Sequence, residues 1–149
     1  MTETPTAEVH GTPLHLWVVG VIALLWNSVG AFDYIMTQTR NEGYMGGFTP
    51  EQLEFFYGFP TWVVAFWAFA VWGSVIGSVL LLMRKRLAVQ AFFVSLVSMV
   101  ITTIHNYGMS NGLEVAGDAF SLVFTAVIFL TAVALLLYAR VLHRRGVLV

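Results

Sequence analysis

The stretch VWGSVIGSVLLLMRKRLAVQAFFVSLVSMV, residues 71–100, decides the fold because it places three cations between two long apolar runs. The Arg-Lys-Arg tripeptide at 84–86 leaves room for only a tight turn. A helix needs about 20 mostly apolar residues to cross the hydrocarbon core of a bilayer. The runs on either side, about 61–83 and 87–107, reach that length. They predict an antiparallel hairpin of two membrane-spanning helices.

Two further apolar runs, about 14–36 and 119–141, raise the number of predicted spans to four. Of the 149 residues, 58% are hydrophobic and only 10% are charged. An average soluble domain has about 25% charged residues, so the composition predicts an integral membrane protein. We expect one all-α transmembrane domain over residues 1–149, a four-transmembrane-helix bundle whose helices run alternately up and down.

The loop between the first two predicted spans contains a helix start at Thr49-Pro50-Glu51-Gln52. Thr49 can cap the helix, Pro50 suits its first position, and Gln52 can complete a capping box. We therefore expect a short helix over about 49–58. Its aromatic residues are typical of a helix that lies at the membrane interface.

The cations predict the orientation of the chain in the membrane. Six of the seven lie either at 84–86 or within 140–145. With four spans, both places fall on the same side as the N-terminus, and the positive-inside rule puts that side in the cytoplasm. We expect residues 1–12 and 142–149 to be cytoplasmic tails. Arg40 is the one cation expected on the outer side.

Polar residues gather toward the outer ends of the predicted spans. With a rise of about 1.5 Å per residue, Asp33 and His105 each lie about 28 Å along a span, near the edge of a core about 30 Å thick. Asp118 enters the last span at the same level. Polar side chains of membrane helices normally face the bundle interior, so we expect the first, third and fourth spans to turn polar stripes toward one another. The predicted ligand-binding residues of this outward-facing polar pocket are Asn27, Asp33, Tyr34, Thr102, His105, Asn106 and Tyr107.

Two structural alternatives stay open. Asp33 and His105 are equally compatible with a hydrogen-bonded lock between two helices. A row of small residues on the second span suits close helix packing, or docking of a second copy or of a larger membrane protein. That row consists of Gly73, Ser74, Gly77 and Ser78.

Several function classes are not supported. The chain has no cysteine, and its net charge of −1 favours no nucleic-acid partner. A haem held in the bundle needs two inward histidines, and only His105 lies at a suitable depth. No nucleophile or metal-ligand set accompanies His105 and Asp33. We therefore expect no catalytic residue, no metal and no cofactor, and an acid–base enzyme is the weakest of three hypotheses.

Three motifs carry a resemblance to a known family. They are LWNSVGAFDYIMTQ (25–38), FTPEQLEFFYGFPTWVVAFWA (48–68) and TTIHNYG (102–108). Together they resemble a family of small four-span bacterial inner-membrane proteins that is often labelled "sugar transporter". The resemblance implies a bacterial inner-membrane location. The label carries no mechanism.

The first hypothesis for the function is binding or transport of a small polar molecule, such as a sugar, through the outer pocket. The second is an accessory or assembly subunit that docks on a larger membrane complex. In either case the lipid bilayer is the expected surrounding of the chain.

Overall fold

The structure, a computed structural model, describes residues 12–116 and 118–149, and within these ranges it contains helices and no strand. The predicted tail 1–12 lies outside the described residues except for Thr12. Three short helices and a π-helical turn connect four long helices. The long helices are α1 (Leu14–Gln38), α4 (Thr61–Leu82), α5 (Leu87–Ile104) and α7 (Ala119–Arg144), and the short elements are α2 (Glu42–Met45), α3 (Pro50–Tyr57), the π-helical turn His105–Met109 and α6 (Gly112–Ala116).

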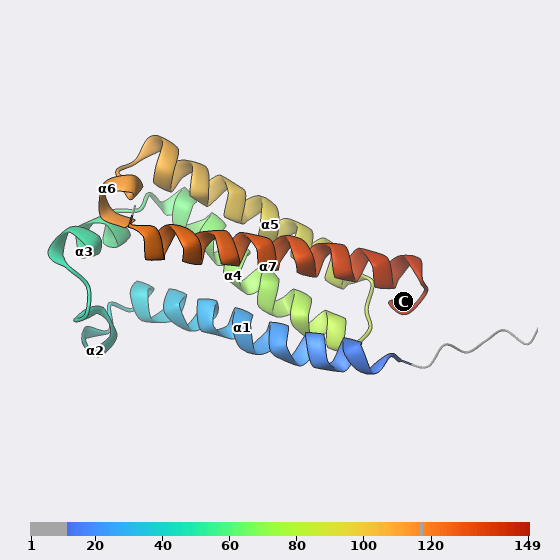
Figure 1. The fold of residues 1–149 in the computed structure, drawn as a ribbon. Helices are drawn as coiled ribbons and strands as arrows, with labels where there is room; N and C mark the ends of the chain where they lie inside the picture. Colours follow the sequence, from blue (N-terminus) through green and yellow to red (C-terminus); the bar gives the residue numbers. More distant parts are fainter. Residues whose placement is uncertain (1–11, 117) are drawn as a thin grey trace, which may run out of the picture.

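The four long helices confirm the predicted all-helical class. Each is long and apolar enough to cross a membrane, with α5 and its π-helical turn together covering Leu87–Met109. They lie side by side and run in alternating directions, as Figure 1 shows. The short helices α2, α3 and α6 gather at one end, and the start of α1 and the C-terminus lie at the other (Figure 1).

Helix α4 lies between α1 and α5 and packs against both, whereas α7 packs mainly against α5. Small residues make the α4–α5 approach close. A Cβ atom on Gly73 would lie 3.3 Å from Cβ of Ser95, and one on Gly77 would lie 2.8 Å from the ring of Phe92. Ser78 is fully buried. Of the two alternatives for the row of small residues, helix packing within the chain is the one that these contacts support.

Polar contacts inside the bundle also converge on α4. Asn27 Nδ2 donates a hydrogen bond to Ser78 Oγ (2.9 Å) and another to the carbonyl oxygen of Ser74 (3.3 Å). From the other side, Ser95 Oγ donates to the carbonyl oxygen of Ala70 (2.5 Å). The expectation that the first, third and fourth spans turn their polar residues toward one another is wrong for Asn27, which bonds to α4 instead, as does Ser95 of α5. The physical reason is the backbone of α4, which its small residues leave open to hydrogen-bond donors from both neighbours.

Helices α1, α4 and α7 end in the same Schellman motif, in which the residue after the cap is left-handed. This residue is Arg40 (φ 53°), Arg84 (φ 55°) and Gly146 (φ 74°), respectively. Glycine is preferred here because a side chain in the left-handed region costs about 1–2 kcal/mol. Two arginines therefore occupy positions where the local backbone favours glycine.

The predicted basic tail, 142–149, is docked rather than extended. Its first residues continue α7 to Arg144, and the chain then turns at Gly146. The Val149 N–H donates to the carbonyl oxygen of Arg84 (2.9 Å), and the Arg86 N–H donates to the main-chain oxygen of Val149 (3.1 Å). Leu148 joins the apolar core with 2% of its surface exposed.

Candidate functional site

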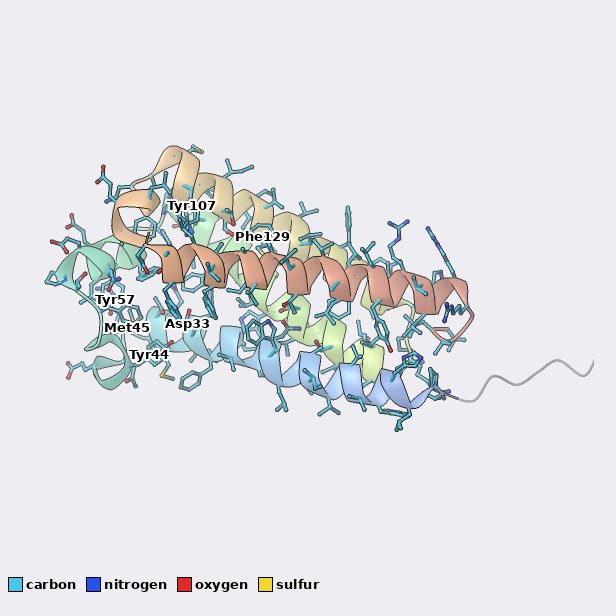
Figure 2. The ribbon with its side chains drawn as sticks, viewed as in Figure 1. Asp33, Tyr44, Met45, Tyr57, Tyr107 and Phe129 are labelled. Carbon is cyan, nitrogen blue, oxygen red and sulfur yellow. The ribbon has the colours of Figure 1, made fainter. Side chains whose placement is uncertain are left out.

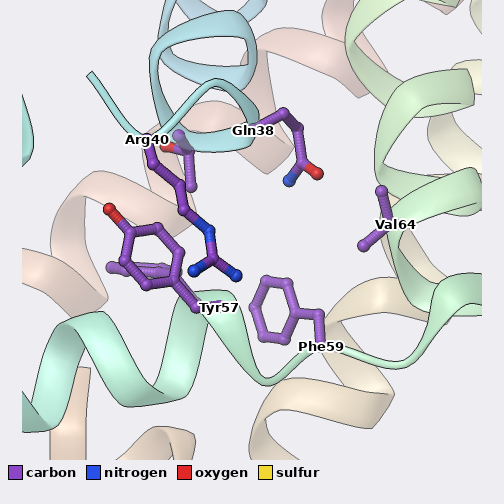
Figure 3. A pocket seen from close by; sticks show the side chains of 7 residues that line it. Gln38, Arg40, Tyr57, Phe59 and Val64 are labelled. Atoms are coloured by element: carbon purple, nitrogen blue, oxygen red, sulfur yellow. The ribbon is translucent and has the colours of Figure 1, made fainter.

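A cavity of about 160 Å³ lies at the end of the molecule that carries α2 and α3. It is formed where α1 ends, α3 passes alongside and α4 begins (Figure 3). Its lining residues carry a guanidinium, an amide, two hydroxyl groups and three aromatic rings. The residues are Thr37, Gln38, Arg40, Phe56, Tyr57, Phe59 and Val64.

Arg40 supplies the charge of this cavity. The turn that ends α1 sends its side chain toward α3, where the guanidinium carbon lies 4.4 Å from the centre of the Tyr57 ring. Figure 3 shows the guanidinium between Tyr57 and Phe59, with Gln38 across the cavity. The seven described residues that line the cavity include no acidic one. The arrangement presents several N–H donors to a polar or anionic group.

Phe59 forms a firm wall on the side of the cavity toward α4 and α5. Its ring lies 5.1 Å from that of Phe55, and 5.9 Å from the rings of both Trp67 and His105, measured between ring centres. All three contacts are edge-to-face, an arrangement that stabilises aromatic pairs beyond their buried area. The Phe59 ring is therefore packed simultaneously against residues of α3, α4 and the π-helical turn.

Helix α3, which carries Phe56 and Tyr57, begins as the sequence predicts. The Gln52 N–H donates to Thr49 Oγ1 (3.2 Å), and the Thr49 N–H donates to Gln52 Oε1 (3.0 Å). The capping box is confirmed, and the helix over Pro50–Tyr57 agrees with the predicted 49–58. This local signal places the aromatic face of α3 beside the end of α1.

The structure separates the predicted ligand-binding residues into several contacts. Asp33 Oδ1 accepts a hydrogen bond from Tyr44 Oη (2.5 Å), and Figure 2 shows both near the end of α1. The Tyr34 ring meets Trp67, 4.9 Å away. His105 Nδ1 lies 3.2 Å from Asn106 Oδ1. Within residues 12–116 and 118–149, no hydrogen bond joins Asp33 to His105.

The remaining predicted residues have structural contacts. Thr102 Oγ1 donates to the carbonyl oxygen of Met99 in its own helix (2.9 Å). Asn106 and Tyr107 pack beside Gly112, and Asn27 bonds α4 as described above. None of the seven predicted ligand-binding residues lines the Arg40 cavity, and their binding role stays a prediction.

Asp118, expected at the same level as Asp33 and His105, has a local role at the start of α7. Its carboxylate accepts hydrogen bonds from the Ser121 N–H (3.1 Å) and from Ser121 Oγ (2.7 Å). These hydrogen bonds lower the pKa of Asp118 below its usual value. A carboxylate at a helix N-terminus is also favoured by the helix dipole.

Arg40 was expected on the outer side of the membrane, but it was not among the predicted ligand-binding residues. The available signal was its isolation as the one cation on the predicted outer side. The aromatic residues of α3 were assigned to the membrane interface instead. Their position against Arg40 depends on how the loop folds back over α1.

Comparisons of this chain with protein families, with curated proteins and with solved structures find no match. Within residues 12–116 and 118–149, no group of three or more His, Asp or Glu side chains is placed to hold a metal ion. The class defined by the fold is an all-helical protein with four helices suited in length and composition to a membrane.

The contact between Tyr44 and Asp33 predicts a pH effect at the same end. Burial, the hydrogen bond to Asp33 and the negative charge of Asp33 raise the pKa of Tyr44 to about 12, from the usual 10.0. Because the pKa of Tyr44 is higher in the folded protein than in the unfolded chain, protonated Tyr44 stabilises the fold. This contribution to the free energy of unfolding is complete below pH 10 and is lost as the pH rises toward 12. An ultraviolet titration of the wild type should therefore show a late-titrating tyrosine that is absent in Tyr44→Phe.

A second variant tests the cause of this shift. Asp33→Asn keeps the tyrosine but removes the negative charge, so Tyr44 should titrate earlier than in the wild type. Identical titration curves for the wild type and both variants would refute the contact.

Proposed function

We propose that this chain is a multi-pass protein of the bacterial inner membrane, spanning it with α1, α4, α5 and α7. The helices expose large apolar side chains to their surroundings, including Leu25 (66% exposed) and Leu130 (69% exposed). A bilayer is the environment that such surfaces require. The family resemblance of the three motifs supports the bacterial location.

The proposed orientation has both termini in the cytoplasm. The Arg-Lys-Arg turn at 84–86 and the end of α7 lie at the end of the molecule that holds the C-terminus, whereas Arg40 lies at the other end. This distribution agrees with the positive-inside rule. Helix α3 would then lie at the outer interface, with the Arg40 cavity on the outer side.

We further propose that the Arg40 cavity binds a small polar molecule. One observation carries this proposal: the Arg40 guanidinium lies in a cavity with aromatic walls, although the backbone of Arg40 is in the strained left-handed conformation. Such strain persists where a side chain is needed for another purpose. The volume of about 160 Å³ is close to that of a cavity of about 150 Å³ that holds benzene, which is the size of one six-membered ring.

A monosaccharide is the ligand class that best suits this lining. A sugar ring has apolar faces that can lie on aromatic side chains, and hydroxyl groups that can accept hydrogen bonds from Arg40 and Gln38. The resemblance to proteins labelled as sugar transporters points to the same class. In this proposal the cavity is the outer entry site for binding or transport.

The variant Arg40→Gly tests the proposal without a large expected loss of stability. It removes the guanidinium and relieves about 1–2 kcal/mol of backbone strain. Two costs oppose this gain: loss of the contact with Tyr57, about 0.5–1 kcal/mol, and the greater chain entropy of glycine in the unfolded state, about 0.5–1 kcal/mol. The gain and the two costs are of similar size. We expect the free energy of unfolding of Arg40→Gly to lie within about 1 kcal/mol of the wild-type value. The stabilisation by added monosaccharides should disappear in this variant.

The measurement is the unfolding temperature of detergent-purified protein with a panel of monosaccharides, with glycerol as the reference solute. A ligand at one hundred times its Kd stabilises by about 2.7 kcal/mol. Arg84→Gly is the matched control, because it relieves the same strain at the far end of the molecule. Stabilisation that survives Arg40→Gly but is lost in Asp33→Asn and His105→Ala would place binding at the residues predicted from sequence instead.

The alternative is an accessory subunit that docks through the small residues of α4 and the aromatic helix α3, or a homo-oligomer through the small residues of α4. Gly77 and Ser78 of the small-residue face are buried within the chain, so they are not available to a partner in this structure. Native mass spectrometry after gentle purification distinguishes the two functions. A stoichiometric complex with a larger membrane protein would favour the accessory subunit over the binding protein.

A further inference from the structure

The docked C-terminal segment brings two basic parts of the sequence together. The turn between α4 and α5 carries the Arg-Lys-Arg tripeptide at 84–86, and the end of α7 carries Arg144 and Arg145. Two main-chain hydrogen bonds between Val149 and the turn join them, at 2.9 and 3.1 Å. Residues separated by almost sixty positions in the sequence thus form one basic surface. We define this basic surface as Arg84, Lys85, Arg86, Arg144 and Arg145.

The junction is fixed by apolar packing as well as by hydrogen bonds. Leu148 and Leu142 each have 2% of their surface exposed, and both belong to the core cluster that includes Leu81. The turn at Gly146 is closed by the Val147 N–H, which donates to the carbonyl oxygen of Leu142 (2.9 Å). The relative position of the two basic segments is therefore built into the fold.

Among the described residues, the acidic side chains lie away from the basic surface. All five of its side chains are exposed. The six acidic residues in the described part of the chain lie toward the opposite end, in the last turns of α1, in α2, α3 and α6, and at the cap of α7. Arg84 Nη1 donates to Thr12 Oγ1 (2.6 Å), which holds this guanidinium in place.

We propose that the basic surface binds the phosphate headgroup of an anionic phospholipid. Arginine presents paired N–H groups that match phosphate oxygens, and basic pockets between membrane helices at the cytoplasmic side bind such headgroups. The inference rests on the proposed membrane location of the chain, and it does not depend on the Arg40 cavity.

The test measures the unfolding temperature of the full-length protein in neutral detergent during titration with phosphatidylglycerol, phosphatidylcholine or inorganic phosphate. We expect phosphatidylglycerol alone to stabilise the wild type. The triple variant Arg84→Gln, Lys85→Gln, Arg86→Gln should need about tenfold more of this lipid, or more, because each basic residue near an anionic surface contributes roughly fivefold. Stabilisation by inorganic phosphate at the same concentrations would overturn the lipid assignment in favour of a soluble anion.

A second pair of variants tests whether lipid binding needs the folded arrangement of the five cations or only their positive charge. Leu148→Asn keeps all five cations but removes the apolar anchor of the tail, and it should raise the half-saturating lipid concentration several-fold. Val149→Asn is the matched control, because its side chain is 73% exposed and its main-chain bonds are retained. Equal lipid responses of Leu148→Asn and Val149→Asn would refute the built site. Failure of sugar binding at Arg40 would leave these results unaffected.

Discussion

Replacement of Gly77 by alanine is expected to destabilise the protein by about 1–3 kcal/mol, and replacement by leucine by more. The new Cβ atom would lie 2.8 Å from Cδ1 and Cε1 of Phe92. The Phe92 ring is 2% exposed and cannot move aside without displacing the core. Helices α4 and α5 would therefore have to separate. The measurement is thermal or denaturant unfolding of the detergent-purified variants.

Gly30→Ala is the matched control on α1. A Cβ atom there would lie 3.8 Å from Val71 Cγ1, an ordinary contact distance, so we expect stability close to that of the wild type. Gly77→Leu also distinguishes packing from partner docking. A stable Gly77→Leu protein that has lost a bound partner would contradict the packing role and restore the accessory-subunit hypothesis.

Replacement of Gly112 by alanine is expected to cost about 3 kcal/mol, the upper part of the range for overpacking. The added methyl carbon would overlap the carbonyl oxygen of Asn106 and lie 2.8 Å from its carbonyl carbon. This neighbour is backbone, so it cannot be relieved by a rotamer change. The π-helical turn His105–Met109 would have to unwind, and His105 would lose its position against Phe59 and Trp62.

The control for this prediction lies in the same turn. A Cβ atom on Gly108 would be 3.9 Å from Ile104 Cγ2, so Gly108→Ala should unfold like the wild type. Loss of stability in both variants would point to a turn that tolerates no added side chain at either glycine, rather than to the close approach at Gly112 alone. Unchanged stability in both would contradict the packing of α6 against the turn.

The features that could be predicted from the sequence are those governed by local chemistry. Apolar length predicted the four long helices, because a helix satisfies its own backbone hydrogen bonds. The start of α3 was predictable because a capping box joins residues three positions apart. The tight connection between α4 and α5 followed from three cations between two apolar runs.

The candidate site was less predictable, because it depends on contacts between distant segments. Arg40 was an isolated cation in the sequence, and only the return of α3 over the end of α1 places Tyr57 against it. Asp33 was expected beside His105 from helical depth. The loop instead supplies Tyr44, which is eleven residues away in sequence and within hydrogen-bond distance.

By itself, the sequence determined that this protein has four long apolar helices, a capped short helix and two separate groups of cations. Those features follow from composition and from interactions within one or two helical turns. Only the tertiary structure decided that α4 lies between α1 and α5, that Arg40 enters an aromatic cavity, and that the segment after α7 is bonded to the Arg-Lys-Arg turn. The reason is that apolar faces on all four helices permit several arrangements. The observed arrangement is the one that allows the close approaches at Gly77 and Gly112 and also buries Leu148.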